Sequence, residues 1–167
     1  GGGGFGDPLE RDPNAVLADW SEGLVSTEGA LRDYGVVIDC DSLNLAATAN
    51  VRMARRRERL NGREPVARTT APRGKRLSTH FSVADGDVLC AGCGTTICTV
   101  AAPIIASLVS FERNSGYRFA LTNLYPGSER FRVRFFCCPG CAAQVDVQVV
   151  IAEDQSNETT QVIALKG

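Results

Sequence analysis

Two short cysteine motifs constrain this chain more strongly than any other feature. Each is a CxxC pair with small or turn-forming residues between the thiols: CAGC at 90–93 and CPGC at 138–141. A tight turn of this kind points two thiolates at one place, and two such turns supply the four sulfurs of a tetrahedral zinc site. We therefore expect Cys90, Cys93, Cys138 and Cys141 to bind one structural Zn²⁺.

The residues before each motif favour a zinc ribbon. Val88-Leu89 leads into the first pair and Phe135-Phe136 leads into the second, so each turn is expected at the end of a strand. The gap between the pairs, residues 94–137, is longer than the usual gap of about 15–20 residues. An additional hairpin over roughly residues 103–124 would fill it.

Other roles for these motifs fit the sequence less well. A redox CxxC pair is expected within a βαβ pattern, and neither motif has one. The odd number of seven cysteines and the lack of a visible export signal favour reduced thiols over disulfides. A catalytic zinc keeps an open coordination position, which four thiolates do not leave. We expect a structural metal, and no catalytic residue in this chain.

Three cysteines lie outside the two motifs. Cys98 comes soon after Cys93 and is an alternative ligand in place of Cys90. Cys137 should point to the opposite side of a strand from Cys138, as a buried or edge residue. We expect Cys40 to be a small buried hydrophobic residue.

Charge is balanced over the whole chain but not along it. The 167 residues contain 18 Lys and Arg against 19 Asp and Glu, a net charge of −1. This balance gives no general reason to bind nucleic acid or an anionic membrane. Residues 7–41 are mainly acidic and residues 52–76 mainly basic. No apolar run approaches the roughly 18 residues that span a bilayer, and we expect a cytoplasmic protein.

Five arginines between residues 52 and 59 could form a nucleic-acid patch. They are Arg52, Arg55, Arg56, Arg57 and Arg59. Without interleaved aromatic residues to stack on bases, a solvated helix face or a docking surface for an acidic partner is the favoured interpretation. A stand-alone nucleic-acid-binding zinc ribbon remains the alternative function.

Residues 1–61 are predicted to form short helices. Asp7-Pro8 and Asp12-Pro13 are helix starts, Ser26 caps a helix that ends at Gly35, and a third helix runs from Asn44 to Leu60. An extended segment at 35–39 separates the last two. So few short helices bury too little apolar area to fold alone, which indicates a partner.

Residues 77–167 are predicted to form antiparallel strands. Candidate strands cover residues 80–89, 104–113, 117–124, 130–137, 144–151 and 160–165. Residues 62–76 have no periodic apolar pattern and are expected to be a basic, flexible linker. The predicted fold class is α+β, with N-terminal helices followed by a β-rich zinc-ribbon-like domain.

The N-terminal part resembles the C-terminal end of hydantoinase B-type subunits. The resemblance covers roughly residues 1–60 and rests on GGGGFGDPLERDP at 1–13 and DYGVV at 33–37. This family includes 5-oxoprolinase relatives and the large subunits of acetone and acetophenone carboxylases. The family's catalytic metal ligands lie upstream of the matching region, so the resemblance carries no catalytic residue over to this chain.

The cysteine-bearing part is similar to the small zinc-containing gamma subunit of acetone carboxylase. The similarity rests on CAGCGTTIC at 90–98, RFFCCPGC at 134–141 and VDV at 145–147. Both resemblances imply an ATP-dependent multisubunit enzyme in which a hydantoinase A-type subunit phosphorylates the substrate. The implied partners are hydantoinase A-type and B-type subunits, and the chain would be a structural piece of that complex.

Overall fold

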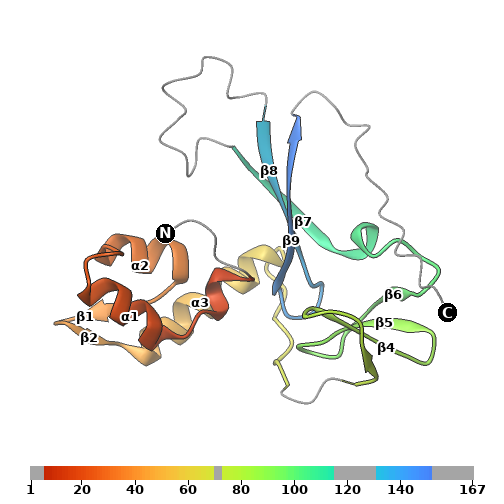
Figure 1. The fold of residues 1–167 in the computed structure, drawn as a ribbon, viewed down its shortest axis with the longest axis horizontal. Coiled ribbons are helices and arrows are strands. Elements are labelled where there is room, and N and C mark those ends of the chain that lie inside the picture. The colour runs from red at the N-terminus through yellow and green to blue at the C-terminus, as the bar shows by residue number, and fades with distance from the viewer. Residues whose placement is uncertain (1–5, 70–72, 115–130, 152–167) are drawn as a thin grey trace. The chain divides into compact units, whose positions relative to one another are not determined.

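The computed structural model describes residues 6–69, 73–114 and 131–151. The chain divides into two compact units, residues 1–65 (unit 1) and residues 66–167 (unit 2). Figure 1 shows unit 1 in red to yellow and unit 2 in yellow-green to blue. Helices form unit 1 and antiparallel strands dominate unit 2, which confirms the predicted α+β class.

Unit 1 contains every helix that the sequence predicts. Its elements are η1 (Pro8–Glu10), α1 (Pro13–Ser21), α2 (Thr27–Tyr34), β1 (Ile38–Asp39), β2 (Ser42–Leu43) and α3 (Leu45–Arg59). Each helix begins where a side chain accepts a hydrogen bond from a free backbone N–H group: Asp7, Asp12, Ser26 and Asn44. Gly35 ends α2 at a φ of 62°, which favours glycine.

The extended segment at 35–39 becomes part of a small hairpin. β1 and β2 pair antiparallel, with Asp39 opposite Ser42. The two residues of the turn, Cys40 and Asp41, have φ values of 46° and 61°. Positive φ at both positions is typical of a two-residue hairpin turn. The expectation of a buried Cys40 is wrong, because this turn leaves the residue exposed.

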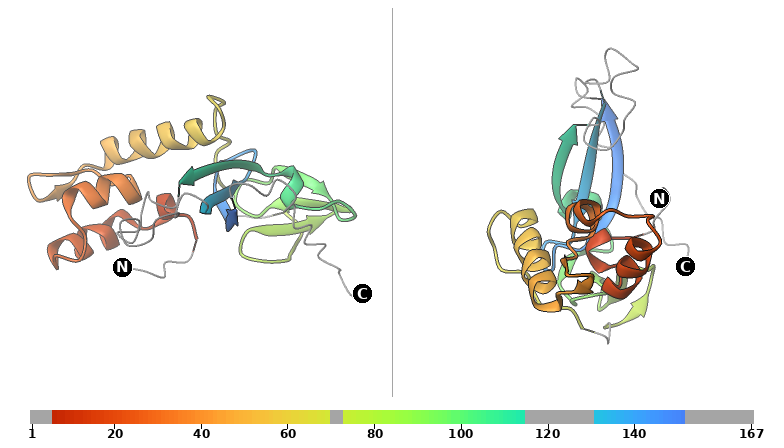
Figure 2. Two further views of the ribbon diagram at one scale, coloured as in Figure 1. Left: turned by 90° about the horizontal axis from the view of Figure 1, so that it is seen from above. Right: turned by 90° about the vertical axis from the view of Figure 1, so that its left-hand side faces the viewer.

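Unit 1 has a small apolar core and an unusual helix α3. The core consists of Val16, Ala30 and Val36 with partly buried neighbours. Figure 2 shows α3 alongside α1 and α2. The face of α3 that meets them is polar: Thr48 is buried, and Arg52 and Arg55 bond to backbone carbonyls of the α2 region. Leu45 and Met53, by contrast, are exposed.

Unit 2 contains two antiparallel sheets. The first has the order β3 (Lys75–Arg76), β4 (Phe81–Ala84), β5 (Asp87–Cys90) and β6 (Thr96–Thr99). After η2 (Ile105–Ser107), the second has the order β7 (Val109–Asn114), β8 (Phe131–Cys137) and β9 (Gln144–Ile151). Figure 1 shows the longer strands of the second sheet side by side. The buried core of unit 2 includes Cys90, Cys138 and Cys141, so the cysteine motifs lie within it.

The strand predictions hold in part among the described residues of unit 2. The single strand expected at 80–89 is wrong, because these residues form the hairpin of β4 and β5 with a turn at Asp85-Gly86, whose positive φ values reverse the chain. β7, β8 and β9 correspond to predicted strands, whereas β6 has no counterpart among them. β7 pairs with β8, and the second half of the hairpin expected within residues 103–124 lies outside the described residues. The predicted strands at 117–124 and 160–165 lie outside the described residues.

The structure departs from the expected linker at 62–76. Unit 2 begins at Val66, and residues 75–76 form strand β3. Val66 N–H bonds to the Gly140 carbonyl and Thr69 N–H to the Gly92 carbonyl. The reason is tertiary: these two backbone N–H groups pair with carbonyls of the two cysteine turns, which are distant in sequence.

Candidate metal centre

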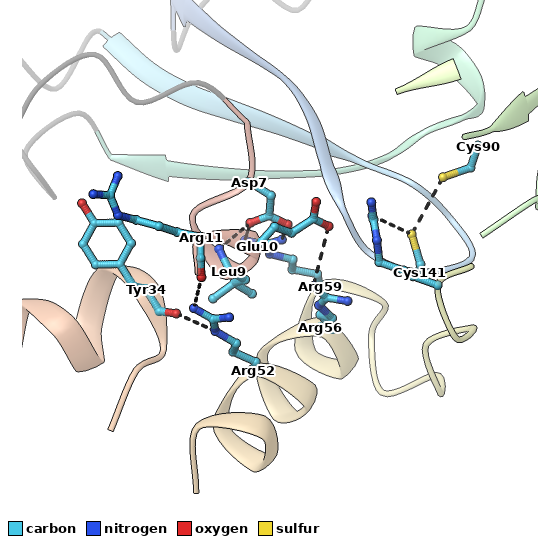
Figure 3. Close-up of polar contacts among 11 residues, drawn as sticks. Asp7, Leu9, Glu10, Arg11, Tyr34, Arg52, Arg56, Arg59, Cys90 and Cys141 are labelled. Atoms are coloured by element: carbon cyan, nitrogen blue, oxygen red, sulfur yellow. Dashed lines mark hydrogen bonds and ion pairs between the residues drawn. The ribbon is translucent and has the colours of Figure 1, made fainter. Parts of the chain in front are cut away.

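The four predicted cysteines come together in unit 2. Cys90 is the last residue of β5 and Cys138 directly follows β8. Their Sγ atoms lie near those of the other turn: Cys90 is 3.9 Å from Cys141 (Figure 3), and Cys93 is 3.7 Å from Cys138. All four sulfurs lie within 4.8 Å of one another. Among the described residues, no other group of His, Cys, Asp or Glu gathers in this way.

The spacing of the sulfurs fits a metal ion. With Zn–S bonds of about 2.3 Å, tetrahedral geometry places any two sulfurs about 3.8 Å apart. The two short Sγ–Sγ distances, 3.9 Å and 3.7 Å, lie close to this separation. Four converging cysteines could therefore hold one ion, and their soft thiolates select a thiophilic metal.

Backbone hydrogen bonds shape the two turns. In the first, Gly94 N–H bonds to the Cys90 carbonyl at 2.8 Å, and Gly94 has a φ of 73°. In the second, Ala142 N–H bonds to the Cys138 carbonyl at 3.0 Å. Gly140 N–H also points at Cys138 Sγ, 3.3 Å away. Each turn thus aims two sulfurs inward, and a backbone donor reaches one of them.

Glycine is required where the two turns meet. A Cβ atom on Gly140 would collide with Thr95 Oγ1 and would lie 2.8 Å from Thr95 Cβ. Such an approach is impossible without a shift of Thr95, a residue of the first turn. Gly140 therefore lets the turns approach closely enough for their sulfurs to converge.

The site is largely buried, and its thiols shift one another's pKa values. Cys138 and Cys141 are fully buried and Cys90 nearly so. Hydrogen bonding with Cys138, and then with Cys141, lowers the pKa of Cys90 to about 6. Hydrogen bonding with Cys138 also lowers the pKa of Cys93, whereas Cys141 and then Cys90 raise the pKa of Cys138. A closed set of four thiols suits a structural ion better than a catalytic one.

The remaining cysteines lie apart from this cluster. Cys98, the alternative ligand, donates from its thiol to the Ala102 carbonyl at 3.7 Å and is not among the four clustered sulfurs. Burial raises the pKa of the Cys98 thiol. Cys137 is fully buried, opposite Val109 of β7. The structure thus brings together the predicted set with Cys90; that these thiols bind a metal remains a prediction.

The arginines of α3 serve the fold of unit 1. Arg52 donates to the carbonyls of Tyr34 and Arg11 at 3.0 Å and 2.8 Å (Figure 3). Arg55 donates to the Arg32 carbonyl. Arg59 contacts both carboxylate oxygens of Asp7, at 2.6 Å and 3.1 Å. Three of the five arginines that the sequence presents as a basic face thus have partners within unit 1.

Arg56 and Arg57 also pair with acids of unit 1. Arg56 lies 3.6 Å from Glu10, and Arg57 lies 2.5 Å from Glu64. The sequence indicates a charged helix face but not these partners. Asp7 is the buried member of the set, with 1% of its side chain exposed. Its Asp-Pro motif is a recognisable helix start, whereas its pairing with Arg59 has no sequence signal.

Comparison with known proteins yields partial similarities. No family model matches the chain. It is 59% identical over 49 residues to the beta subunit of caprolactamase from Pseudomonas jessenii, covering 29% of this chain and 8% of that protein. It is 44% identical over 52 residues to the B-type component of a putative D-/L-hydantoinase from Pseudomonas sp. (strain NS671), covering 30% and 9%.

A third relative belongs to a carboxylase. The chain is 40% identical over 72 residues to the acetone carboxylase alpha subunit of Xanthobacter autotrophicus (strain ATCC BAA-1158 / Py2), covering 40% of this chain and 9% of that protein. Part of the chain is therefore similar to hydantoinase and carboxylase subunits. The chain spans less than a tenth of the length of each of these relatives. No described helix is both long and apolar enough to span a membrane.

Proposed function

We propose that this chain is a zinc-stabilised structural and assembly module of an ATP-dependent enzyme complex. The complex is of the hydantoinase/oxoprolinase type or the acetone/acetophenone carboxylase type. The main observation in support of zinc binding is the cluster formed by the thiols of Cys90, Cys93, Cys138 and Cys141. The partial similarity to hydantoinase B-type and carboxylase subunits supports the setting.

Zinc is the metal that this donor set favours. It accepts four thiolates in tetrahedral geometry without redox chemistry, and such sites hold small folds together. In this chain the ion would join the end of β5 to the segment after β8, and hence one sheet of unit 2 to the other. We assign the metal a structural role because its four ligands leave no position for a substrate.

Apolar side chains on the surface of unit 1 support an assembly role. Leu24 is 65% exposed and Leu45 is 61% exposed, and Leu31 and Met53 are exposed as well. On α3, Arg52 and Arg55 bond to backbone carbonyls of unit 1, whereas the apolar side chains of Leu45 and Met53 are exposed. In this proposal a partner subunit covers these side chains, as is typical of apolar residues that form one continuous exposed surface.

The proposed partners are hydantoinase A-type and B-type subunits in the cytoplasm. We propose further that unit 2 corresponds to the zinc-containing gamma subunit of acetone carboxylase, on the strength of its cysteine turns. In this proposal the chain supplies no catalytic group, and catalysis belongs to the partner subunits.

Co-expression with its partners tests the assembly role. The chain would be produced together with candidate hydantoinase A-type and B-type proteins from the same organism, and complexes would be separated by size and analysed for zinc. We expect one complex that contains all three proteins, and a Leu45→Glu/Met53→Glu variant that is lost from it. A wild-type chain that stays a lone stable monomer beside its folded partners would contradict the assembly role.

A further inference from the structure

The segment at residues 66–69 lies against both cysteine turns. Val66 N–H bonds to the Gly140 carbonyl at 2.9 Å, and Thr69 N–H bonds to the Gly92 carbonyl at 2.7 Å. We call this segment the strap. Gly140 belongs to the CPGC turn and Gly92 to the CAGC turn, so the strap connects the two halves of the candidate metal centre.

The side chain of Arg68 reaches the sulfur cluster from the strap. Its Nη1 atom lies 3.7 Å from Cys141 Sγ, and the guanidinium N–H donates to this sulfur. Cys141 is fully buried and lies 3.9 Å from Cys90 Sγ. The guanidinium is therefore positioned at the edge of the four-sulfur cluster.

Gly92 provides the space for this guanidinium. A Cβ atom on Gly92 would lie 2.5 Å from Arg68 Cζ and 2.6 Å from Arg68 Nη2. The guanidinium thus packs directly against the backbone of the first turn. Because the obstructed group is the end of a flexible side chain, a methyl group at residue 92 would displace the guanidinium without requiring a backbone shift.

A positive charge at this position has a clear physical use. Four thiolates around a divalent ion leave two negative charges in excess, and a buried excess charge is costly unless it is paired. A hydrogen bond donated to a thiolate stabilises its charged form and lowers its tendency to take up a proton. Groups that contact metal ligands in this way typically change metal affinity by about 10–100-fold when they are removed.

We propose that Arg68 is a positioning and charge-balancing residue of the metal centre, which donates to Cys141 Sγ and offsets the excess thiolate charge. The inference rests on the proposed zinc function. It assigns a role to a residue of the basic segment at 62–76 that the sequence presents as a linker. The backbone bonds of the strap hold the segment in place, and the guanidinium supplies the charge.

The test uses the full chain loaded with Co²⁺ or Zn²⁺. Arg68→Met removes the positive charge but keeps an unbranched side chain. Arg68→Lys keeps a positive charge but lacks the planar guanidinium. Gly92→Ala displaces the guanidinium while residue 68 stays an arginine. Arg73→Met is the matched control, because Arg73 is an exposed arginine close by in sequence. Metal affinity is measured by competition with a chromophoric chelator, and the thiolate-to-Co²⁺ charge-transfer band by absorption.

We expect Arg68→Met to weaken metal affinity by about 10-fold or more and to move the charge-transfer band to longer wavelength, because the Cys141 thiolate becomes more electron-rich. Gly92→Ala should shift both in the same direction, Arg68→Lys should shift them less, and Arg73→Met should match the wild type. A merely structural side chain would not move the band energy.

Two outcomes overturn the inference in different ways. If the wild-type chain binds one metal ion, and Arg68→Met and Gly92→Ala match it in affinity and band energy, Arg68 has no role at the centre while the zinc proposal stands. If the wild-type chain binds no metal at all, the zinc proposal fails and this inference fails with it.

Discussion

The two units of this chain are held together by different chemistry. Unit 1 has a small apolar core and depends on capped helix ends and on arginines of α3 that bond to carbonyl and carboxylate groups. Unit 2 gathers its core around Cys90, Cys138 and Cys141. The hydrogen bonds and ion pairs described for unit 1 join groups of the chain to one another. The centre of unit 2, by contrast, is a set of thiols suited to binding an ion.

The two units should therefore respond differently to the same treatment. Removing the metal or changing a cysteine should unfold unit 2 and leave unit 1 unchanged. Changing Asp7 or Gly35 of unit 1 should do the reverse.

The largest effect is expected for Cys138→Ser. Loss of one of the four sulfurs should abolish tight metal binding, whose apparent free energy in small zinc modules is about 10–16 kcal/mol. We expect amide signals of residues 73–114 and 131–151 to lose dispersion in NMR spectra, while signals of residues 6–65 keep their positions. Cys98→Ser is the control and should bind metal normally, since Cys98 lies outside the cluster. If unit 2 stays folded in the Cys138→Ser variant, its fold does not depend on the metal, and the proposed difference between the two units is wrong.

Acidification should release the metal from unit 2. If the metal-free unit 2 is unfolded, its four cysteine thiols have ordinary pKa values and are protonated near pH 7. About four protons then leave when the ion binds. The free energy of metal binding therefore weakens by about 5 kcal/mol for each unit that the pH drops. In a metal-free unit 2 that stays folded, the pKa of Cys90 is about 6 and that of Cys93 is also lowered. Fewer than four protons would then leave, because the lowered pKa values make these two thiols lose their protons more readily.

Calorimetric metal titration in buffers of different ionisation enthalpy counts these protons. We expect about four for the wild-type chain. A count well below four would show that the thiol cluster is preformed without metal, so that unit 2 folds without the ion.

Asp7→Ala should destabilise unit 1 alone. The carboxylate is buried, caps η1 and holds Arg59 through both oxygens. Removing it leaves the partly buried Arg59 charge without this partner, at a cost of about 3–5 kcal/mol. Urea unfolding followed by helical circular dichroism measures the loss. The control Glu64→Gln breaks only the exposed pair with Arg57 and should cost less than about 1 kcal/mol. Equal losses of stability in the two variants would contradict the structural role given to the Asp7–Arg59 ion pair.

The smallest effect is expected for Gly35→Ala. Gly35 has a φ of 62°, and an added Cβ atom would lie 3.1 Å from Arg52 Cγ. Left-handed backbone costs an L-residue about 1–2 kcal/mol, so the midpoint of unit 1 unfolding should fall slightly. Metal affinity should not change; a change in it would mean that the units are energetically coupled.

Local features of this molecule can be predicted from sequence, and tertiary pairings cannot. The caps at Asp12, Ser26 and Asn44 are recognisable because each acts on the backbone two or three residues away. The CxxC turns are recognisable for the same reason. The strap has the sequence pattern of a flexible linker because its backbone partners, Gly92 and Gly140, are distant in sequence.

The same limit explains the other departures. The inward orientation of Arg52 depends on carbonyl groups of Arg11 and Tyr34, which no periodicity reveals. Cys40 is expected in a core because cysteine is usually buried, but the hairpin turn of β1 and β2 places it outside. β6 is short and polar at both ends, so it lacks the apolar pattern of a strand.

X-ray absorption at the zinc K edge tests the central claim most directly. The purified full chain, loaded with one equivalent of Zn²⁺, should give a single shell of four sulfur atoms at about 2.3 Å. The same shell is expected in Cys98→Ser. A shell that contains nitrogen or oxygen, or a wild-type chain that retains no zinc after desalting, would contradict the assignment of Cys90, Cys93, Cys138 and Cys141 as the four ligands.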